Sequence, residues 1–309
     1  MSELLSGLLA GGWPFLVGSV FPAAIALALE QAVAASTGHG SSLTASAATV
    51  VAGAVALGLL LSALQVPMYR FLEGYYLKEP RAGTWAHSQR VRRDQLRDEL
   101  LARRRGFSNS MAGIKRGLLV EQLRRYPSED DQVAPTRFAN HLRALERYGR
   151  DRFCLDSQTL WNELINVVPG TLRDDEQHAR AGVDFFVALI YLGLVGGTAA
   201  GVAVILDPTH WIVFGSVAAG ALASTWLWYE LAVISVSPWY LAVQAIVNLG
   251  RVPLAAKLGL VLPASLEEER QMWRTVGWLV REPYNPRISE LLEPYRATPP
   301  DPRASATEP

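Results

Sequence analysis

Charged side chains are almost absent from two long tracts of the sequence. Residues 4–69 and 185–250 contain no lysine or arginine, and their only carboxylates are Glu30, Asp207 and Glu230. A soluble protein needs charge along the whole chain, because its surface elements face water and ionised side chains are almost never fully buried unless paired. Hydrocarbon rejects ions. The two tracts therefore predict an integral membrane protein.

The apolar tracts divide into four segments of membrane-spanning length. A bilayer core of about 30 Å needs about 20 apolar helical residues, and residues 12–35, 44–67, 184–206 and 211–236 meet that requirement. Helices are expected because every backbone N–H and C=O group in lipid must be bonded within its own segment. We expect an all-α, polytopic protein with four transmembrane helices in two hairpins.

The distribution of basic residues predicts the orientation of these helices. The two connections inside the hairpins, residues 36–43 and 207–210, contain no lysine or arginine, whereas all 29 basic side chains lie in 70–180 and 251–303. Lysine and arginine are retained on the cytoplasmic side of a membrane. We therefore expect a multi-pass protein of the cell inner membrane with both termini in the cytoplasm.

This topology divides the chain into five parts. They are a transmembrane hairpin at 1–72, a helical cytoplasmic module at 73–182, a second transmembrane hairpin at 183–238, amphipathic cytoplasmic or juxtamembrane helices at 239–296, and a Pro-rich, polar tail at 297–309 that we expect to be disordered.

The run Leu231–Gly250 is also uncharged and could form a fifth span. We favour a long fourth helix that kinks at Pro238 and continues into the cytoplasm, because no connection separates the two runs. Further along, Ser265 followed by Glu268 predicts the start of a capped helix.

Residues 113–126 have the spacing of an amphipathic helix. Its apolar side chains are expected on one face: Ile114, Leu118, Leu119 and Leu123. The 87–105 segment before it contains seven arginines and three acids. Such a cluster beside a membrane attracts anionic lipid head groups, and the basic residues that we expect to face lipid are Arg103, Arg104, Arg105, Lys115 and Arg116. A solvated, salt-bridged helix face is the alternative.

Three acids lie in or beside the predicted spans: Glu30, Asp184 and Glu230. An ionised side chain inside a membrane is costly and normally has a purpose, so these residues could form a cation or proton path. No lysine or arginine inside the spans is available as their partner. The alternative is that each acid lies at a membrane–water interface.

Small residues repeat along the third predicted span. Gly193, Gly197 and Gly201 are four residues apart and share one helix face, and Gly220 in the fourth span has a serine four residues to either side. Small residues let membrane helices approach closely. The stripe predicts packing of the third span on the fourth within one chain, or a homo-oligomer interface.

The segment that begins at Pro135 is dense in polar side chains. The candidates for a cytoplasmic polar network are Arg137, Asn140, Arg143, Glu146, Arg152 and Asp156. Such a network would lock this helix against its neighbour. In an enzyme, all of these residues except Arg152 would instead form a polar pocket around Asn140 and Arg143.

Motifs for a cofactor or metal are missing from the sequence. It has no phosphate loop, no nucleophile elbow and no His-x-x-x-His zinc helix, and Cys154 is the single cysteine. We expect no cofactor and no metal site. Nucleic-acid binding is disfavoured, because residues 70–182 carry 16 acidic side chains beside 21 basic ones.

Three stretches resemble a group of uncharacterised multi-pass bacterial membrane proteins that is common in actinobacteria. They are LQVPMYRFLEGY at 64–75, PTRFANHLRALERYGRDRFCLDSQTLW at 135–161, and LGLVLP at 258–263 with the helix that follows as far as Trp273. The resemblance implies a bacterial inner-membrane protein with this layout. It implies no activity.

The leading functional hypothesis is a non-enzymatic, oligomeric scaffold, sensor or assembly factor whose cytoplasmic helices bind a protein partner, with membrane lipids as further partners. A channel or transporter that uses Glu30 and Glu230 is the first alternative, and a membrane-bound enzyme with a pocket at Asn140 and Arg143 is the second.

Overall fold

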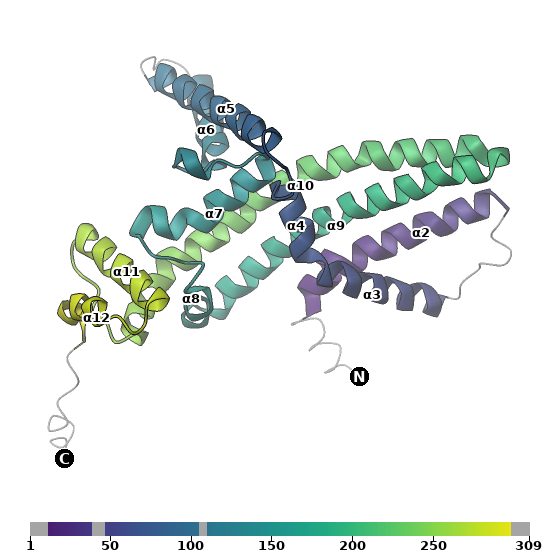
Figure 1. Ribbon diagram of the computed structural model, residues 1–309. Coiled ribbons are helices and arrows are strands. Elements are labelled where there is room, and N and C mark those ends of the chain that lie inside the picture. The colour runs from purple at the N-terminus through teal and green to yellow at the C-terminus, as the bar shows by residue number, and fades with distance from the viewer. Residues whose placement is uncertain (1–11, 39–46, 105–109, 298–309) are drawn as a thin grey trace. The chain divides into compact units, whose positions relative to one another are not determined.

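A computed structural model describes residues 12–38, 47–104 and 110–297 of the chain. Within these ranges every regular element is a helix, and the only β-type pairing is an isolated bridge between Leu260 and Arg296. The predicted all-α class is confirmed (Figure 1). The expected tail after Ala297 lies outside the described residues, as does Arg105.

The chain forms two compact units. The first contains residues 1–143 and 175–240, and the second contains 144–174 and 241–309. Three long helices each contain residues of both units. They are α7 (Arg137–Phe153), α9 (Gly170–Leu206) and α10 (Trp211–Lys257).

The N-terminal helices of the first unit begin with a π-helical turn, η1 (Leu16–Val20), which continues as α2 (Phe21–Ser36). Helix α3 (Ala47–Ala63) packs against both, as Figure 1 shows. Gly58 permits this approach, because a Cβ at that position would lie 3.0 Å from the Val20 side chain.

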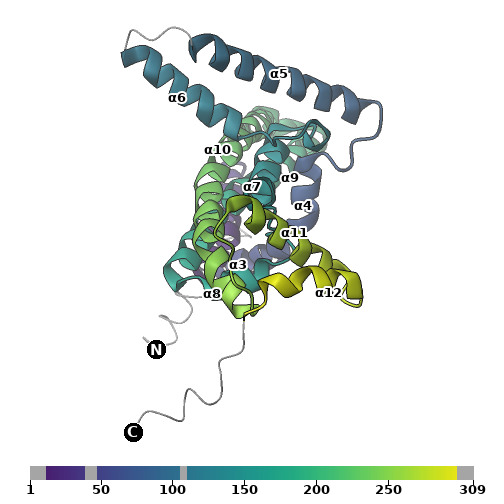
Figure 2. The ribbon, with the colours of Figure 1, turned by 90° about the vertical axis from the view of Figure 1, so that its left-hand side faces the viewer.

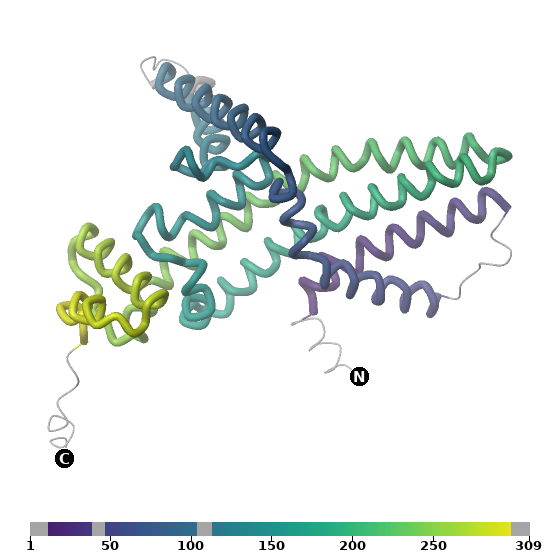
Figure 3. The backbone as a smooth tube through the Cα atoms, viewed as in Figure 1, coloured from purple at the N-terminus to yellow at the C-terminus, as the bar shows by residue number. Residues whose placement is uncertain are grey.

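The second predicted span does not run straight to residue 67. Helix α3 ends at Ala63, and α4 (Gln65–Glu73) leaves it at an angle of 54° (Figure 3). Pro67 explains the position of the break. Proline has no N–H to donate to the carbonyl of Ala63 four residues earlier, and its ring clashes with that carbonyl.

Helices α9 and α10 form the second hairpin. A short turn, η4 (Pro208–His210), joins them, and the Asp207 carboxylate caps this turn by accepting hydrogen bonds from the Thr209 N–H at 3.1 Å and from His210 Nδ1 at 2.8 Å. Helix α10 continues through Pro238 to Lys257, so the predicted continuous fourth helix is confirmed.

Among the described residues, three helical stretches are long and apolar enough to cross a membrane: Gly12–Ser36, Gly170–Leu206 and Pro208–Lys257. The bent pair of α3 and α4 would make a fourth if the two are counted as one span. The helix lengths and compositions therefore agree with a membrane protein.

Helices α5 (Arg81–Arg104) and α6 (Ser110–Arg124) pack side by side (Figure 2). Helix α6 lies where the amphipathic helix was expected, but its apolar side chains are not all buried. Leu119 is buried, whereas Ile114 and Leu118 are 60% and 54% exposed. Residues 118 and 119 are about 100° apart on a helix, and α5 covers only one of the two directions.

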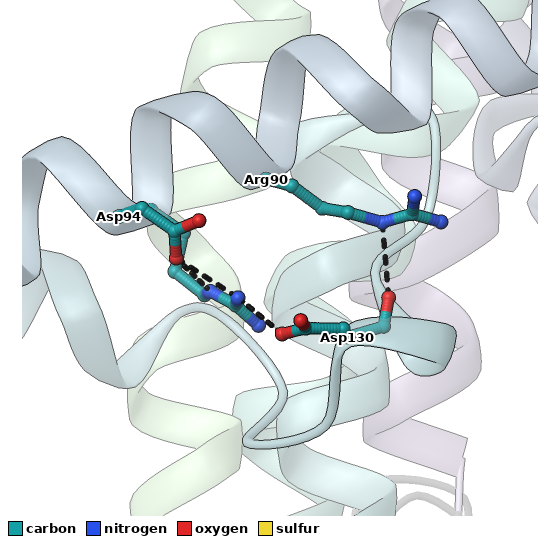
Figure 4. Close-up of polar contacts among 4 residues, drawn as sticks. Arg90, Asp94 and Asp130 are labelled. Atoms are coloured by element: carbon teal, nitrogen blue, oxygen red, sulfur yellow. Dashed lines mark hydrogen bonds and ion pairs between the residues drawn. The ribbon is translucent and has the colours of Figure 1, made fainter.

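Arg93 ties this pair of helices to the linker that follows it. Its guanidinium is buried and donates to Asp94 Oδ1 at 2.9 Å and to Asp130 Oδ1 at 2.5 Å, while Arg90 Nε donates to the Asp130 carbonyl at 3.0 Å (Figure 4). The hydrogen bonds from Arg93 lower the pKa of the Asp130 carboxyl below its usual value. The linker is thereby fixed on α5.

The second unit has its own core. Its shorter helices are α8 (Trp161–Val167), α11 (Leu266–Arg281), α12 (Pro286–Leu292) and the turn η5 (Glu293–Tyr295). Met272 and Trp273 on α11 are fully buried. Ser265 accepts a hydrogen bond from the Glu268 N–H at 3.2 Å, so the predicted capped helix start is confirmed.

Candidate functional site

Helix α7 carries the polar segment that the sequence singled out, and its apolar side is buried. Phe138, Leu142 and Leu145 are at most 6% exposed. Asn140 and His141 are buried among them. Buried polar side chains of this kind need hydrogen-bond partners, and those partners indicate what each residue does.

Arg137 pairs with Glu230 of α10. The Arg137 guanidinium also lies over the Tyr229 ring, 5.8 Å from its centroid. The expectation that no lysine or arginine inside the spans is available as a partner for the acids still holds, because Arg137 lies outside the predicted spans. The partner exists, but it comes from the polar segment between the two hairpins, 93 residues earlier in the chain.

The Asn140 side chain forms its hydrogen bonds with backbone groups. Its amide nitrogen donates to the carbonyls of Ala134 and Thr136 at 3.0 and 2.8 Å, and its Oδ1 accepts from the Ala134 N–H at 2.7 Å. These bonds hold the turn that precedes α7. Arg143 lies over the Tyr75 ring at 5.8 Å. The contacts described for Asn140 and Arg143 are thus to the backbone and to an aromatic ring.

His141 is the functional-type residue that sequence reasoning missed. It is 2% exposed, and its Nδ1 lies 3.0 Å from the Val233 carbonyl oxygen of α10. A carbonyl only accepts, so Nδ1 carries the proton. Burial lowers the pKa of His141 to about 4, which outweighs the opposite effect of this hydrogen bond. A histidine at helical spacing in the sequence carries no signal of such burial.

The remaining residues of the predicted network, Glu146, Arg152 and Asp156, belong to the second unit. Asp156 pairs with Arg281. The carbonyl of Arg152 accepts a hydrogen bond from Arg270 at 3.1 Å, and the Glu146 carbonyl lies 3.4 Å from a serine hydroxyl that donates to it. The six candidates are thus divided between the two units, each with contacts of its own.

A further ion pair in the second unit was not expected from the sequence. Arg251 Nη1 lies 2.6 Å from Glu269 Oε1, and the Arg251 guanidinium lies 4.5 Å from the centroid of the Phe153 ring. Trp273 Nε1 donates to the same carboxylate at 3.2 Å. Glu269 and Trp273 are four residues apart, a spacing that places them on the same face of a helix. Arg251 is 18 residues from Glu269, so its contact with that carboxylate has no such local signal.

The acids of α9 also have donors. Tyr69 of α4 donates its hydroxyl hydrogen to Asp184 Oδ1 at 2.6 Å, and Arg180 Nε lies 4.0 Å from Asp184 Oδ2. One helical turn before Arg180, Glu176 accepts from Trp239 Nε1 at 2.8 Å. Glu30, on α2, is exposed. The three acids expected to form an ion path therefore have different surroundings.

Two of the four predicted packing glycines lie where α9 meets α10. A Cβ at Gly193 would be 3.2 Å from the Ala221 carbonyl oxygen, and one at Gly197 would be 3.0 Å from the Leu222 side chain. Gly201 and Gly220 do not take part in this contact within the single chain, because a Cβ at either position would meet nothing within 4 Å. Close approach of the two helices uses only the first half of the stripe.

The basic residues predicted to face lipid also differ from one another in their surroundings. Arg103 donates to Glu99 one turn earlier at 2.8 and 3.1 Å. Lys115 is exposed and Arg116 is half-buried. Arg104 ends α5, and Arg105 lies beyond the described residues.

In the described ranges, no three histidine, cysteine, aspartate or glutamate side chains are placed to hold a metal ion. Comparison of the sequence with protein-family models and curated proteins, and of the structure with solved structures, gives no match.

Proposed function

We propose that the chain is an integral membrane protein of four spans, with both termini in the cytoplasm, that acts as a non-enzymatic scaffold for a cytoplasmic protein partner. The two apolar hairpins anchor it, and the helices of the second unit present the partner-binding surface. The bacterial inner membrane as its location is supported by the charge distribution and by the family resemblance. Self-association through the glycine stripe is part of the same proposal.

The observation that supports a scaffold is the use of the polar side chains of α7. Asn140 bonds to backbone groups, Arg137 bonds to Glu230, and Arg143 lies on Tyr75. A catalytic pocket would need some of these groups to converge on a position that a reacting atom could occupy. Here they join secondary-structure elements to one another, which is a structural role.

The same reasoning bears on the ion path. A path needs carboxylates that can exchange a proton or cation, whereas Glu230 is paired with Arg137 and Asp184 accepts from Tyr69. Both contacts favour a structural role for these acids. The channel and the membrane-bound enzyme remain weaker proposals than the scaffold.

Cysteine labelling tests the topology. In a Cys154→Ser background, Thr209→Cys lies in the exposed turn between α9 and α10, and Ser88→Cys lies on an exposed face of α5. A membrane-impermeant maleimide should label position 209 in intact cells and position 88 only after permeabilisation. Labelling of position 88 in intact cells, or recovery of the chain without detergent, would overturn the proposed topology.

Photo-cross-linking tests the scaffold. Trp278 and Tyr284 in the second unit are 46% and 96% exposed, and large exposed aromatic side chains are enriched where proteins bind one another. A photoreactive residue at 284 should give an adduct of one defined mass in cells, and the same residue at the exposed Glu267 should not. The scaffold is contradicted if neither 278 nor 284 gives an adduct, or if the purified chain shows turnover that Asn140→Ala abolishes.

A further inference from the structure

Helix α6 has an apolar stripe that no other described helix covers. Ile114 and Leu118 are 60% and 54% exposed, and one helical turn separates them. Leu119, about 100° from Leu118 around the helix, is buried, and α5 packs against α6. A Cβ added at Gly117 between the two stripe residues would meet nothing within 4 Å. The outer face of α6 is therefore free to contact something else.

The pair of helices that carries this stripe has a net positive charge. Helices α5 and α6 together carry ten basic and four acidic side chains. Lys115, next to Ile114 in the sequence, is exposed. A helix with large apolar residues and a basic polar face binds in the interface of an anionic membrane, where the apolar side chains enter the head-group region and the cations remain beside the phosphates.

The position of α5 and α6 in the chain also favours a membrane as the partner. Helix α5 begins at Arg81, eight residues after α4 ends at Glu73, and α4 continues the second apolar helix. A short connection to a membrane-embedded segment holds a surface at high effective concentration near the lipid. A second copy of this hairpin would bring two net positive surfaces together, and like charges disfavour that contact.

We propose that the outer face of α6, the stripe of Ile114 and Leu118 with Lys115 at its edge, docks onto the head-group region of an anionic lipid leaflet. This inference rests on the proposed membrane insertion and cytoplasmic orientation. It assigns α6 a lipid contact that is distinct from the protein-binding surface of the second unit, and the docked helix would hold the α5–α6 pair against the membrane that anchors the chain.

Lipid quenching in nanodiscs tests the docking with the full chain. In the Cys154→Ser background, a fluorophore on Gln122→Cys reports on the outer face of α6 and leaves the stripe intact, because Gln122 is exposed and lies one turn after Leu118. The matched control is Gln95→Cys, which is exposed on the side of α5 opposite the buried Arg93. Brominated lipids should quench the probe at 122 several-fold more than the probe at 95.

The lipid composition and a stripe variant separate the outcomes. Quenching at 122 should be lost in discs of phosphatidylcholine alone, at about 1 M salt where charges are screened within about 3 Å, and in the double variant Ile114→Ser/Leu118→Ser. Equal quenching in neutral and anionic discs would overturn the anionic lipid assignment. A spectral shift at 122 without bromine quenching, seen only in discs with two copies, would assign the stripe to a second copy instead.

The failure of this inference is distinguishable from the failure of the proposed function. If the chain does not insert, it will not incorporate into the discs. If it inserts and α6 does not dock, the chain will be present in the discs and the probes at 122 and 95 will respond alike.

Discussion

His141 should make the stability of the protein depend on pH. Its side chain is 2% exposed, its Nδ1 donates to the Val233 carbonyl, and its folded-state pKa is about 4. The ordinary histidine pKa is about 6.5. Between these two values the unfolded chain binds a proton that the folded chain does not bind, so the free energy of unfolding falls as pH falls. The contribution of His141 is fully present above about pH 6.5.

The size of the effect follows from the difference between the two pKa values. A change from about pH 7 to about pH 5 should lower the free energy of unfolding by about 2 kcal/mol through His141 alone. The substitution His141→Asn removes the titrating group, and its amide can still donate from nearly the same place to the Val233 carbonyl. The variant should lose stability at neutral pH, because its smaller side chain leaves a cavity, and should lose most of the pH dependence in this range.

The measurement is unfolding of the detergent-solubilised chain by a denaturing detergent at several pH values. Other groups also titrate, so the informative quantity is the difference between the pH slopes of wild type and variant. His87→Asn is the matched control, since His87 is exposed on α5 and its loss should leave the slope nearly unchanged. The reasoning about His141 is refuted if His141→Asn keeps the wild-type slope.

Two further pairs of substitutions have opposite expected outcomes. Arg137→Gln should destabilise the detergent-solubilised chain by about 1–3 kcal/mol, because it leaves the half-buried carboxylate of Glu230 unpaired. The double variant Arg137→Gln/Glu230→Gln should recover part of that loss in a double-mutant cycle. Strict additivity of the two single substitutions would show that the pair is not coupled. Gly149→Ala should destabilise the protein by about 1–3 kcal/mol in thermal unfolding, since the new Cβ would lie 2.9 Å from a backbone carbonyl oxygen. Gly182→Ala should instead stabilise it by up to about 1 kcal/mol, because a Cβ at that position meets nothing within 4 Å. Equal effects of the two substitutions would contradict the packing at Gly149.

The sequence predicted the elements better than the contacts between them. The apolar segments and the capped helix at Ser265 depend on residues close together in the chain, and the structure has helices at those places. The break after Ala63 also has a local cause, since Pro67 is four residues later and cannot donate to the Ala63 carbonyl. Local patterns of this kind are readable because helix geometry couples residues three and four apart.

The contacts of the candidate site depend on pairs that are distant in sequence. Nothing near Glu230 indicates that Arg137 will reach it, and the apolar neighbours of His141 do not show which carbonyl its ring will meet. Helix α6 shows the same limit. Its spacing indicated an apolar face, but the choice between Leu119 and Leu118 as the buried side chain depended on where α5 packs.

The polar contacts between α7 and α10 determine how these two helices are aligned. Arg137, the Phe138 N–H and His141 lie within about one turn of α7, and they meet Glu230, the Tyr229 hydroxyl and the Val233 carbonyl, which lie within about one turn of α10. Apolar side chains at these positions would tolerate a shift of one helix along the other. A shift of one turn, about 5.4 Å, would break all three contacts together and leave a carboxylate and a buried imidazole without partners. These buried polar groups therefore favour one alignment of the two helices. A shifted alignment would have a higher free energy, because the same groups would be buried without hydrogen-bond partners.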